Sequence, residues 1–160
     1  MSIVQYKQFS GFSLIELITV IVLLGILSVF AIGRLSSPDQ FAAKGFFDNT
    51  VNAVRFAHKL AVSSGCNVQV NITNAGYQLR HSAVCDRNNF NFNAVVVNPA
   101  NRSNLYQNLL TGFTIAPATS IIFNARGTTN SGNTVPYTVT GGGNDYGFTV
   151  FGQTGLINVP

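Results

Sequence analysis

The amino-acid sequence predicts an α+β fold in which one long N-terminal helical region is followed by strands only. Apolar residues occupy most of positions 12–33 and then recur at helical spacing to about residue 63. Beyond residue 66 the apolar period falls to two, and the alternating runs are separated by Gly, Asn and Ser. Strands without intervening helices are typical of an antiparallel sheet, and we expect the helix to pack on that sheet.

The first half of this helical region is apolar and contains one charged residue. Residues 12–33 comprise 22 positions, and Glu16 carries their only charge. As a helix they would extend about 33 Å, enough to cross a hydrocarbon core of about 30 Å, so we expect a membrane-spanning helix. A lone carboxylate in hydrocarbon is costly and is by default a functional group that needs a cationic partner. No Lys or Arg within the segment supplies one.

The polar stretch before the apolar segment suggests a source for that cation. Cleavage after Gly11 would leave an α-amino group on Phe12, four residues before Glu16. The two charges could pair within one helix or between staggered neighbouring helices. Gly11, Phe12 and Glu16 resemble the class III signal of type IV pilins and type II secretion pseudopilins. In that signal, Gly and an aromatic residue are followed by Glu as a long apolar helix begins.

This resemblance implies a structural subunit of a bacterial fibre with the pilin fold. A prepilin peptidase would cut between Gly11 and Phe12 on the cytoplasmic side and methylate the new N-terminus. Glu16 would then neutralise the N-terminus of an adjacent subunit during assembly. The implied partners are the peptidase, other pilins or pseudopilins contacted through the N-terminal helix, and the inner membrane before assembly. The chain would cross that membrane once, with its head in the periplasm, and then enter a pilus or pseudopilus.

Two other interpretations of the N-terminus stay open. An ordinary secretory signal peptide would be cut after the small residue Ala31, although Glu16 would interrupt its apolar region. An uncleaved membrane anchor is the second. Lys7 fits a cytoplasmic N-terminus, whereas Arg34 beyond the far end weakens the charge asymmetry, so the orientation depends mainly on the motif.

The predicted organisation is a leader at 1–11, a transmembrane and assembly half-helix at 12–33, and a soluble head at 34–160. Removing the first 33 residues leaves 127, enough for one compact domain. Charged residues make up only 9% of the chain, so amides, hydroxyls and glycines must keep the head soluble. Such a surface suits association with copies or relatives of the same protein.

Within the head, the helix should continue to about residue 63, although Pro38 could kink or interrupt it. Its sheet-facing side is expected to carry Phe47, Val51, Val54, His58 and Ala61, with Asp48, Asn52, Arg55 and Lys59 facing solvent. A hairpin is predicted from residues 68–72 and 77–80. Further strands are predicted at 93–97, 119–124, 135–140, 146–151 and 156–159, with a turn at 141–145.

Two cysteines, Cys66 and Cys85, enclose 18 residues. In an oxidising compartment they would form a disulfide that contributes about 3 kcal/mol in the chain-entropy model. Two buried free thiols or a metal site are the alternatives. His58 and His81 are isolated and show no metal-ligand spacing, so a structural bridge is the better account and no metal is expected.

The C-terminal region resembles the GspH/FimT class of minor pilins and pseudopilins, and MSHA-type minor pilins share this look. The similarity lies in residues 121–127, 148–151 and 155–157. Cysteines just after the helix, rather than near the C-terminus as in major type IV pilins, favour a minor subunit. Members of this class often carry Arg after the last Gly, whereas Leu156 stands there in this chain.

No enzymatic function and no cofactor are expected. The head's carboxylates, Asp39, Asp48, Asp86 and Asp145, are widely spaced, and no catalytic triad order or phosphate-binding loop appears. The cations Arg80, Arg87, Arg102 and Arg126 are scattered, so no nucleic-acid partner is expected. The Asn-rich stretch 86–104, with Phe90 and Phe92, could bind carbohydrate or a partner, and we prefer it as the subunit contact of the head.

The predicted function is therefore a minor pilin or pseudopilin of a type IV (MSHA-like) pilus or a type II secretion pseudopilus. The alternative is an adhesive or DNA-binding minor pilin at the tip of a competence or uptake pilus.

Overall fold

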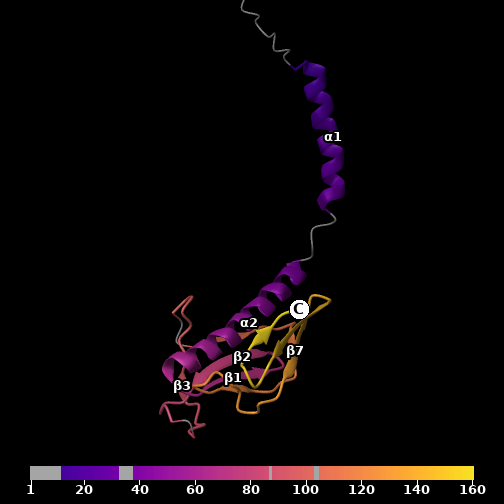
Figure 1. The fold of residues 1–160 in the computed structure, drawn as a ribbon. Coiled ribbons are helices and arrows are strands. Elements are labelled where there is room, and N and C mark those ends of the chain that lie inside the picture. Colours follow the sequence, from indigo (N-terminus) through magenta and orange to yellow (C-terminus); the bar gives the residue numbers. More distant parts are fainter. Residues whose placement is uncertain (1–11, 33–37, 87, 103–104) are drawn as a thin grey trace, which may run out of the picture. The chain divides into compact units, whose positions relative to one another are not determined.

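The computed structural model describes residues 12–32, 38–86, 88–102 and 105–160 (Figure 1). The chain separates into two units, residues 1–36 and residues 37–160. The first contains helix α1 (Leu14–Ile32), and the second, the head, contains helix α2 (Pro38–Ser64) and all the strands. The predicted α+β class, with a helix packed on antiparallel sheets, is confirmed.

Helix α2 begins and ends where its sequence dictates. Pro38 occupies the first helical position. A backbone N–H at that position would have no partner within the helix, so proline loses nothing by lacking one, and its fixed φ suits the helix. At the other end Gly65 adopts a φ of 71°, and its N–H donates to the carbonyl of Ala61 at 3.0 Å, which closes the last turn. The stretch before Pro38, where we expected a kink, lies outside the described residues.

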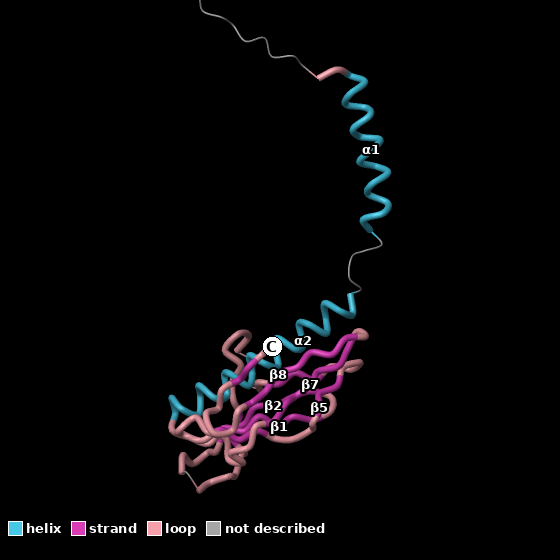
Figure 2. The backbone as a smooth tube through the Cα atoms, turned by 45° about the vertical axis from the view of Figure 1, so that its right-hand side comes forward, coloured by secondary structure: helices cyan, strands magenta, loops and turns pink. Residues whose placement is uncertain are grey.

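The strands form two antiparallel sheets, where we predicted one. The first sheet contains β3 (Ala94–Val95), β2 (Gly76–His81), β1 (Val68–Thr73) and β6 (Ile121–Phe123) in that order, with β4 (Gln107–Leu109) also paired to β2. The second contains β5 (Thr114–Ala116), β7 (Val135–Gly141), β8 (Asn144–Val150) and β9 (Ile157–Asn158). Both lie alongside α2 (Figure 2).

The single-sheet prediction was wrong because strand pairing is decided by contacts between distant segments. β1 pairs with β6 rather than with a strand of the second sheet, and the N–H of Ile115 donates to the carbonyl of Asn74 at 3.1 Å where the two sheets come close. Strands β4 and β5 were not predicted. Each has three residues, too few to show an alternating pattern.

The predicted hairpins are present with well-defined turns. β1 and β2 pair from Val68 with His81 to Thr73 with Gly76. β7 and β8 are joined through Gly142 and Gly143, whose φ angles are 58° and 79°. Positive φ at both central residues is the turn geometry that matches the twist of paired strands, and it requires residues such as glycine. A turn therefore lies within the predicted range 141–145, but it consists of Gly142 and Gly143, and the flanking residues belong to the strands.

One face of α2 provides the centre of the core. Val54, Ala57 and Ala61 are completely buried, and α2 contacts strands of both sheets. Large side chains of the second sheet fill the space beneath the helix, where the rings of Tyr137 and Phe148 stack with centroids 5.2 Å apart. The predicted apolar face is thus confirmed, except that His58 is only half-buried and meets the ring of Phe123 edge-on.

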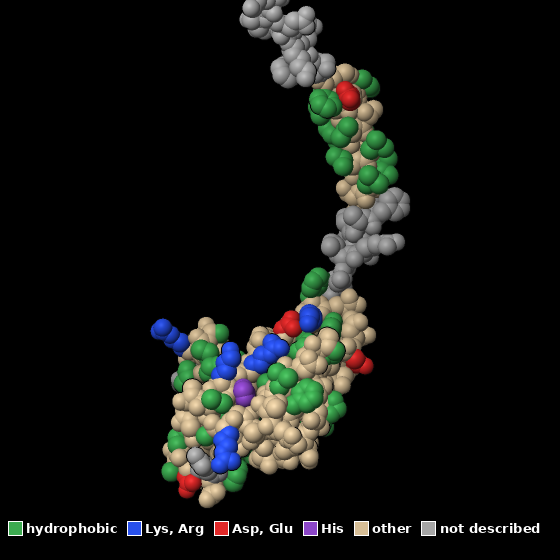
Figure 3. Space-filling model, viewed as in Figure 1, with side chains coloured by type: hydrophobic (Ala, Val, Ile, Leu, Met, Phe, Trp, Pro, Cys, Tyr) green, Lys and Arg blue, Asp and Glu red, His purple; other side chains and the backbone are tan. Residues whose placement is uncertain are grey.

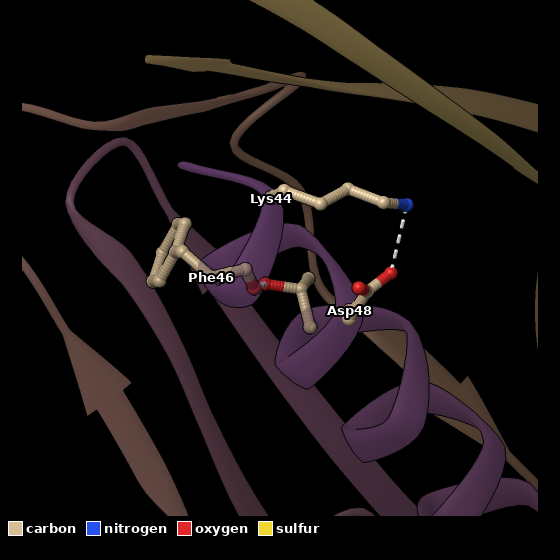
Figure 4. A network of polar contacts seen from close by, with 4 residues as sticks. Lys44, Phe46 and Asp48 are labelled. Carbon is tan, nitrogen blue, oxygen red and sulfur yellow. Dashed lines mark hydrogen bonds and ion pairs between the residues drawn. The ribbon is translucent and has the colours of Figure 1, made fainter. Parts of the chain in front are cut away.

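The outer face of α2 is polar and contributes less. Lys44 Nζ and Asp48 Oδ1 lie 3.0 Å apart one helical turn from each other (Figure 4). Both side chains are about half exposed, so the pair is worth a fraction of a kcal/mol, about 0.3 to 0.5 for such spacing. The same ammonium lies 4.6 Å from the ring centre of Phe47. These contacts cover the edge of the core rather than hold it together.

Tyr77 is the buried polar group of the core that links helix and sheet. Its hydroxyl donates to the carbonyl of Asn49 on α2 at 3.1 Å, and the residue is 2% exposed. Burial, followed by the neighbouring phenol of Tyr106, raises the pKa of Tyr77 far above its usual value. Burial raises the pKa of Tyr137 as well. Both phenols therefore hold their protons longer in the folded than in the unfolded protein.

We expect the head to lose stability as the pH rises above about 10, where unfolded tyrosines ionise. Above that pH the folded state binds more protons than the unfolded state, so the free energy of unfolding decreases. In denaturant titrations, Tyr77→Phe should cost about 1 kcal/mol near neutral pH through the lost hydrogen bond. The free energy of unfolding of this variant should also decrease less at alkaline pH than that of the wild type. An identical alkaline loss in both proteins would contradict the role of Tyr77.

Candidate functional site

The predicted assembly residues lie at the start of α1. Gly11 is outside the described residues, Phe12 precedes the helix with 82% of its surface exposed, and Glu16 lies in the first helical turn. The carbonyl of Ser13 accepts the N–H of Leu17 at 3.2 Å, so the helix begins directly after Ser13. Ser13 and Glu16 thus have the spacing of a capping box. The carboxylate also lies at the helix end where the macrodipole favours negative charge.

Glu16 is the group through which this helix start can bind a cation. Its backbone carbonyl accepts the hydroxyl of Thr19 at 2.9 Å, but its carboxylate makes no hydrogen bond or ion pair with any residue the structure describes. An α-amino group on Phe12 would be a positive charge at a helix N-terminus, which the macrodipole disfavours. A carboxylate within one turn compensates that charge. The geometry therefore suits pairing between Glu16 and a new N-terminus.

The rest of α1 is apolar on every side. All its large apolar side chains from Leu14 to Leu27 are exposed in the isolated chain, as Figure 3 shows for one face. A helix that is apolar all round is stable only where apolar material surrounds it. In the part of the chain that the structure describes, no helix meets the length and hydropathy required of a membrane span.

In the head, a disulfide joins Cys66 at the end of α2 to Cys85 after β2, with 4.4 Å between the Cα atoms. The next residue, Asn67, is 2% exposed and reinforces the same connection. Its side-chain amide donates to the carbonyls of Asp86 at 3.4 Å and Asn89 at 3.0 Å. The sequence reasoning did not identify Asn67, because an Asn in an Asn-rich chain carries no signal of burial. The bridge and this amide together hold the following loop.

That loop begins the Asn-rich stretch 86–104, for which we predicted a partner contact. Phe90 is 54% exposed and Phe92 half-buried, and their rings meet edge-on with centroids 6.5 Å apart. Between this loop and the segment after β6 lies a hollow of about 300 Å³. A contact between this stretch and another subunit stays a prediction.

The carboxylates and histidines of the head have separate local roles. Asp48 pairs with Lys44, Asp145 accepts the hydroxyl of Thr140 at 2.6 Å, and Asp86 accepts the N–H of Asn88 at 3.1 Å. No three His, Cys, Asp or Glu side chains gather as a metal site within the described residues. The Nε2 of His58 is buried and has no hydrogen-bond partner among the described residues. This atom lies close to the turns that contain Gly127 and Gly155. A side chain at either glycine would collide with the His58 ring.

Three of the four cations considered for nucleic-acid binding lie on different elements of the described structure. Arg80 lies on β2 and donates from Nε to the side chain of Gln78 at 3.1 Å, Arg102 follows β3, and Arg126 occupies the turn after β6. Arg87 lies outside the described residues. On the face in Figure 3, several Lys and Arg side chains lie near one another along one side of the head, and one lies beside an acidic side chain.

Comparison with protein-family models identifies the N-terminal segment. Residues 6–32 match the model of the prokaryotic N-terminal methylation motif, which prepilin-type proteins carry. The match includes Gly11, Phe12 and Glu16, and it extends to the last residue of α1. The predicted resemblance to prepilin-type proteins is therefore confirmed. A comparison with curated protein sequences gave no significant match.

Among solved structures, this chain matches two crystal forms of the type IV minor pilin FimU of Pseudomonas aeruginosa. They are 14% and 15% identical to this chain, with TM-scores of 0.48 and 0.49, and cover 76% of it and 87% and 91% of their own chains. The minor pseudopilin EpsH of the type 2 secretion system of Vibrio cholerae is 12% identical. Its TM-score is 0.44, and the alignment covers 76% of this chain and 94% of EpsH.

We expect peptide mapping without reductant to recover Cys66 joined to Cys85. Removing the bridge should lower the free energy of unfolding by about 3 kcal/mol, because the unfolded chain regains the freedom of the closed loop. Cys66→Ser, Cys85→Ser and the double variant should lose the same amount, since either change removes the whole bridge. Two thiols that react with an alkylating reagent in the native exported protein would contradict the bridge.

Proposed function

We propose that this chain is a minor pilin or pseudopilin, a structural subunit of a type IV pilus, including an MSHA-like pilus, or of a type II secretion pseudopilus. The match of residues 6–32 to the N-terminal methylation motif is the observation that carries this proposal. The exposed apolar surface of α1 supports it, since an assembled fibre or a membrane would cover that surface. The motif implies processing by a prepilin peptidase and assembly with other pilins.

In this proposal, residues 1–11 are a leader and residues 12–33 anchor the chain in the inner membrane before assembly, with the head in the periplasm. The supporting observation is the sequence of residues 12–33, which has one charge in 22 positions. Cleavage frees the α-amino group of Phe12, and methylation leaves it cationic. Glu16 of one subunit then pairs with the Phe12 amine of its neighbour as the helices pack.

The proposed mechanism follows from the cost of a buried charge. Neither an unpaired carboxylate nor an unpaired ammonium is stable among apolar helices, whereas the pair is tolerated. A subunit can therefore leave the lipid for the fibre without exposing either charge to hydrocarbon. The remaining apolar side chains of α1 give contact area, and the charge pair sets the register between helices. An enzymatic role is not proposed.

The processing prediction is tested by the mature N-terminus. Expressed together with an active prepilin peptidase, the protein should begin at N-methylated Phe12 in mass spectra. Without the peptidase, or with Gly11→Val, it should keep Met1, because the small residue before the cut is lost. An intact Met1 in the presence of active peptidase, or a start after Ala31, would exclude the proposed cleavage.

The assembly prediction concerns Glu16. Glu16→Ala makes α1 more apolar, so membrane insertion and cleavage should persist. Incorporation beside other pilins should fall about tenfold or more, because an unpaired buried amine costs several kcal/mol. Ser28→Ala is the matched control. This substitution also removes a polar group from α1. Among the described residues, the Ser28 hydroxyl donates only to the carbonyl of Leu24, at 2.7 Å.

Fractionation and co-purification with partner pilins distinguish the outcomes for Glu16. Normal incorporation of Glu16→Ala at wild-type expression would remove this residue from the mechanism. Loss of the variant from the membrane fraction would show that the segment is not the proposed anchor. The control should insert, be cleaved and assemble like the wild type.

A further inference from the structure

The hollow of about 300 Å³ in the head is lined by one cation, one aromatic ring, amides and a hydroxyl. Phe90 lines it from the loop held by the disulfide, and Asn124, Arg126, Thr129 and Asn130 line it from the segment after β6. Asn67, the residue before β1, and Ile122 on the paired strand β6 complete the lining. These segments are far apart in the sequence and meet only in the fold.

The hollow is held in shape by bonds that do not involve a ligand. On the loop side, the buried amide of Asn67 donates to the carbonyls of Asp86 and Asn89, next to the Cys66–Cys85 bridge. On the other side, the Asn124 side chain accepts the N–H of Arg126 at 2.9 Å and donates to the Thr128 hydroxyl at 2.7 Å. A site ordered beforehand loses little entropy when a ligand binds.

Three side chains of the lining have functional groups that are exposed and available to a ligand. The Arg126 guanidinium and the Asn130 carboxamide are exposed and make no side-chain hydrogen bond with the described residues. Phe90 presents 54% of its surface. None of the described lining residues is acidic, so the guanidinium has no competing carboxylate within the hollow.

Each of these groups selects a feature of the ligand. A guanidinium binds a carboxylate through two parallel hydrogen bonds, a geometry that Lys cannot provide. A carboxamide both donates and accepts, which suits hydroxyl groups. The face of an aromatic ring carries partial negative charge and attracts the weakly positive C–H groups of an apolar ring face. One ligand class combines a carboxylate, hydroxyls and a ring with an apolar C–H face.

We propose that this hollow binds a carboxylated sugar, namely a hexuronic acid unit within an acidic polysaccharide. Arg126 binds the carboxylate, Asn130 binds ring hydroxyls, and the C–H face of the sugar packs on Phe90. The volume lies at the small end of ligand sites, which fits one or two sugar rings rather than a folded partner. This binding function goes beyond the proposed assembly role and does not depend on it.

A single-stranded nucleic acid also combines negative charge with flat rings, but it fits this hollow less well. Its affinity comes from several Lys or Arg residues that neutralise successive phosphates. Arg126 is the one cation among the described residues of the lining. One guanidinium matches the single carboxylate of a uronic acid unit, so the structure favours the sugar.

The test uses the full-length protein in detergent micelles and isothermal titration calorimetry. Three probes are compared: tetragalacturonate, its methyl ester and a thymidine oligonucleotide of equal negative charge to the tetramer. We expect saturable binding of tetragalacturonate and about tenfold weaker binding, or none, of the neutral ester, because the charge-assisted bonds are lost. Absence of binding, equal affinity for acid and ester, or tighter binding of the oligonucleotide would overturn the proposal.

Matched variants locate the binding in the hollow. Arg126→Gln should weaken tetragalacturonate binding about tenfold, whereas Arg80→Gln, an equal loss of charge on β2, should change it less than about twofold. Phe90→Ala should weaken it about fivefold, and Val84→Ala, an exposed apolar residue in the same loop, should not. Thermal unfolding of each variant confirms that the head is folded. Equal weakening within either pair would indicate attraction to the surface in general and overturn the proposal.

Discussion

The head depends on a single strip of α2, because both sheets bury their apolar faces against the same helix. Val54, Ala57 and Ala61 have no exposed surface, and the two alanines allow the strands to approach the helix closely. Each sheet has an apolar face that must be buried against another layer, and α2 provides that layer for both sheets. The helix therefore joins the two sheets in one core. Substitutions on this strip should therefore affect both sheets together, unlike those on the exposed face of Asp48 and Lys44.

His58 extends this strip toward the turns that shape the hollow. The sequence pattern placed it on the apolar face, but the structure sets its ring against Phe123 and beside Gly127 and Gly155. Gly127 has a φ of 82°, and a Cβ there would lie 2.7 Å from Nε2 of His58. Only glycine allows the turn to lie against the helix. The position of Arg126, one residue before that glycine, thus depends on this packing and on the bond from its N–H to the Asn124 side chain.

Features set by neighbouring residues were predictable from the sequence, whereas those set by distant ones were not. Helix α2, the β1–β2 hairpin and the glycine turn before Asn144 follow from local periodicity and turn chemistry. The separation into two sheets depends on which distant strands pair, and β4 and β5 are too short to show a period.

The same distinction applies to the candidate sites. Gly11, Phe12 and Glu16 lie within six residues, so the motif could be read directly, and its match with a family model agrees. The hollow combines residues near 67, 90 and 126, which no sequence window contains. The sequence marked the stretch 86–104 by its Asn residues and its two Phe. It did not indicate that Arg126 would line the same hollow as Phe90, because that arrangement depends on the pairing of β6 with β1.

The two units of the chain meet opposite physical demands, and this explains their different compositions. Helix α1 exposes its large apolar side chains and carries a single charge, Glu16, which in the proposed assembly selects the neighbouring helix. The head completes its own core within residues 37–160, and its outer surface relies on amides and hydroxyls with few charges. In the proposed assembly the charge pair and the apolar contact area both lie on α1, so head loops that make no subunit contact can diverge without changing them. A binding site made of loop residues on such a head can change its ligand while the assembly helix stays the same.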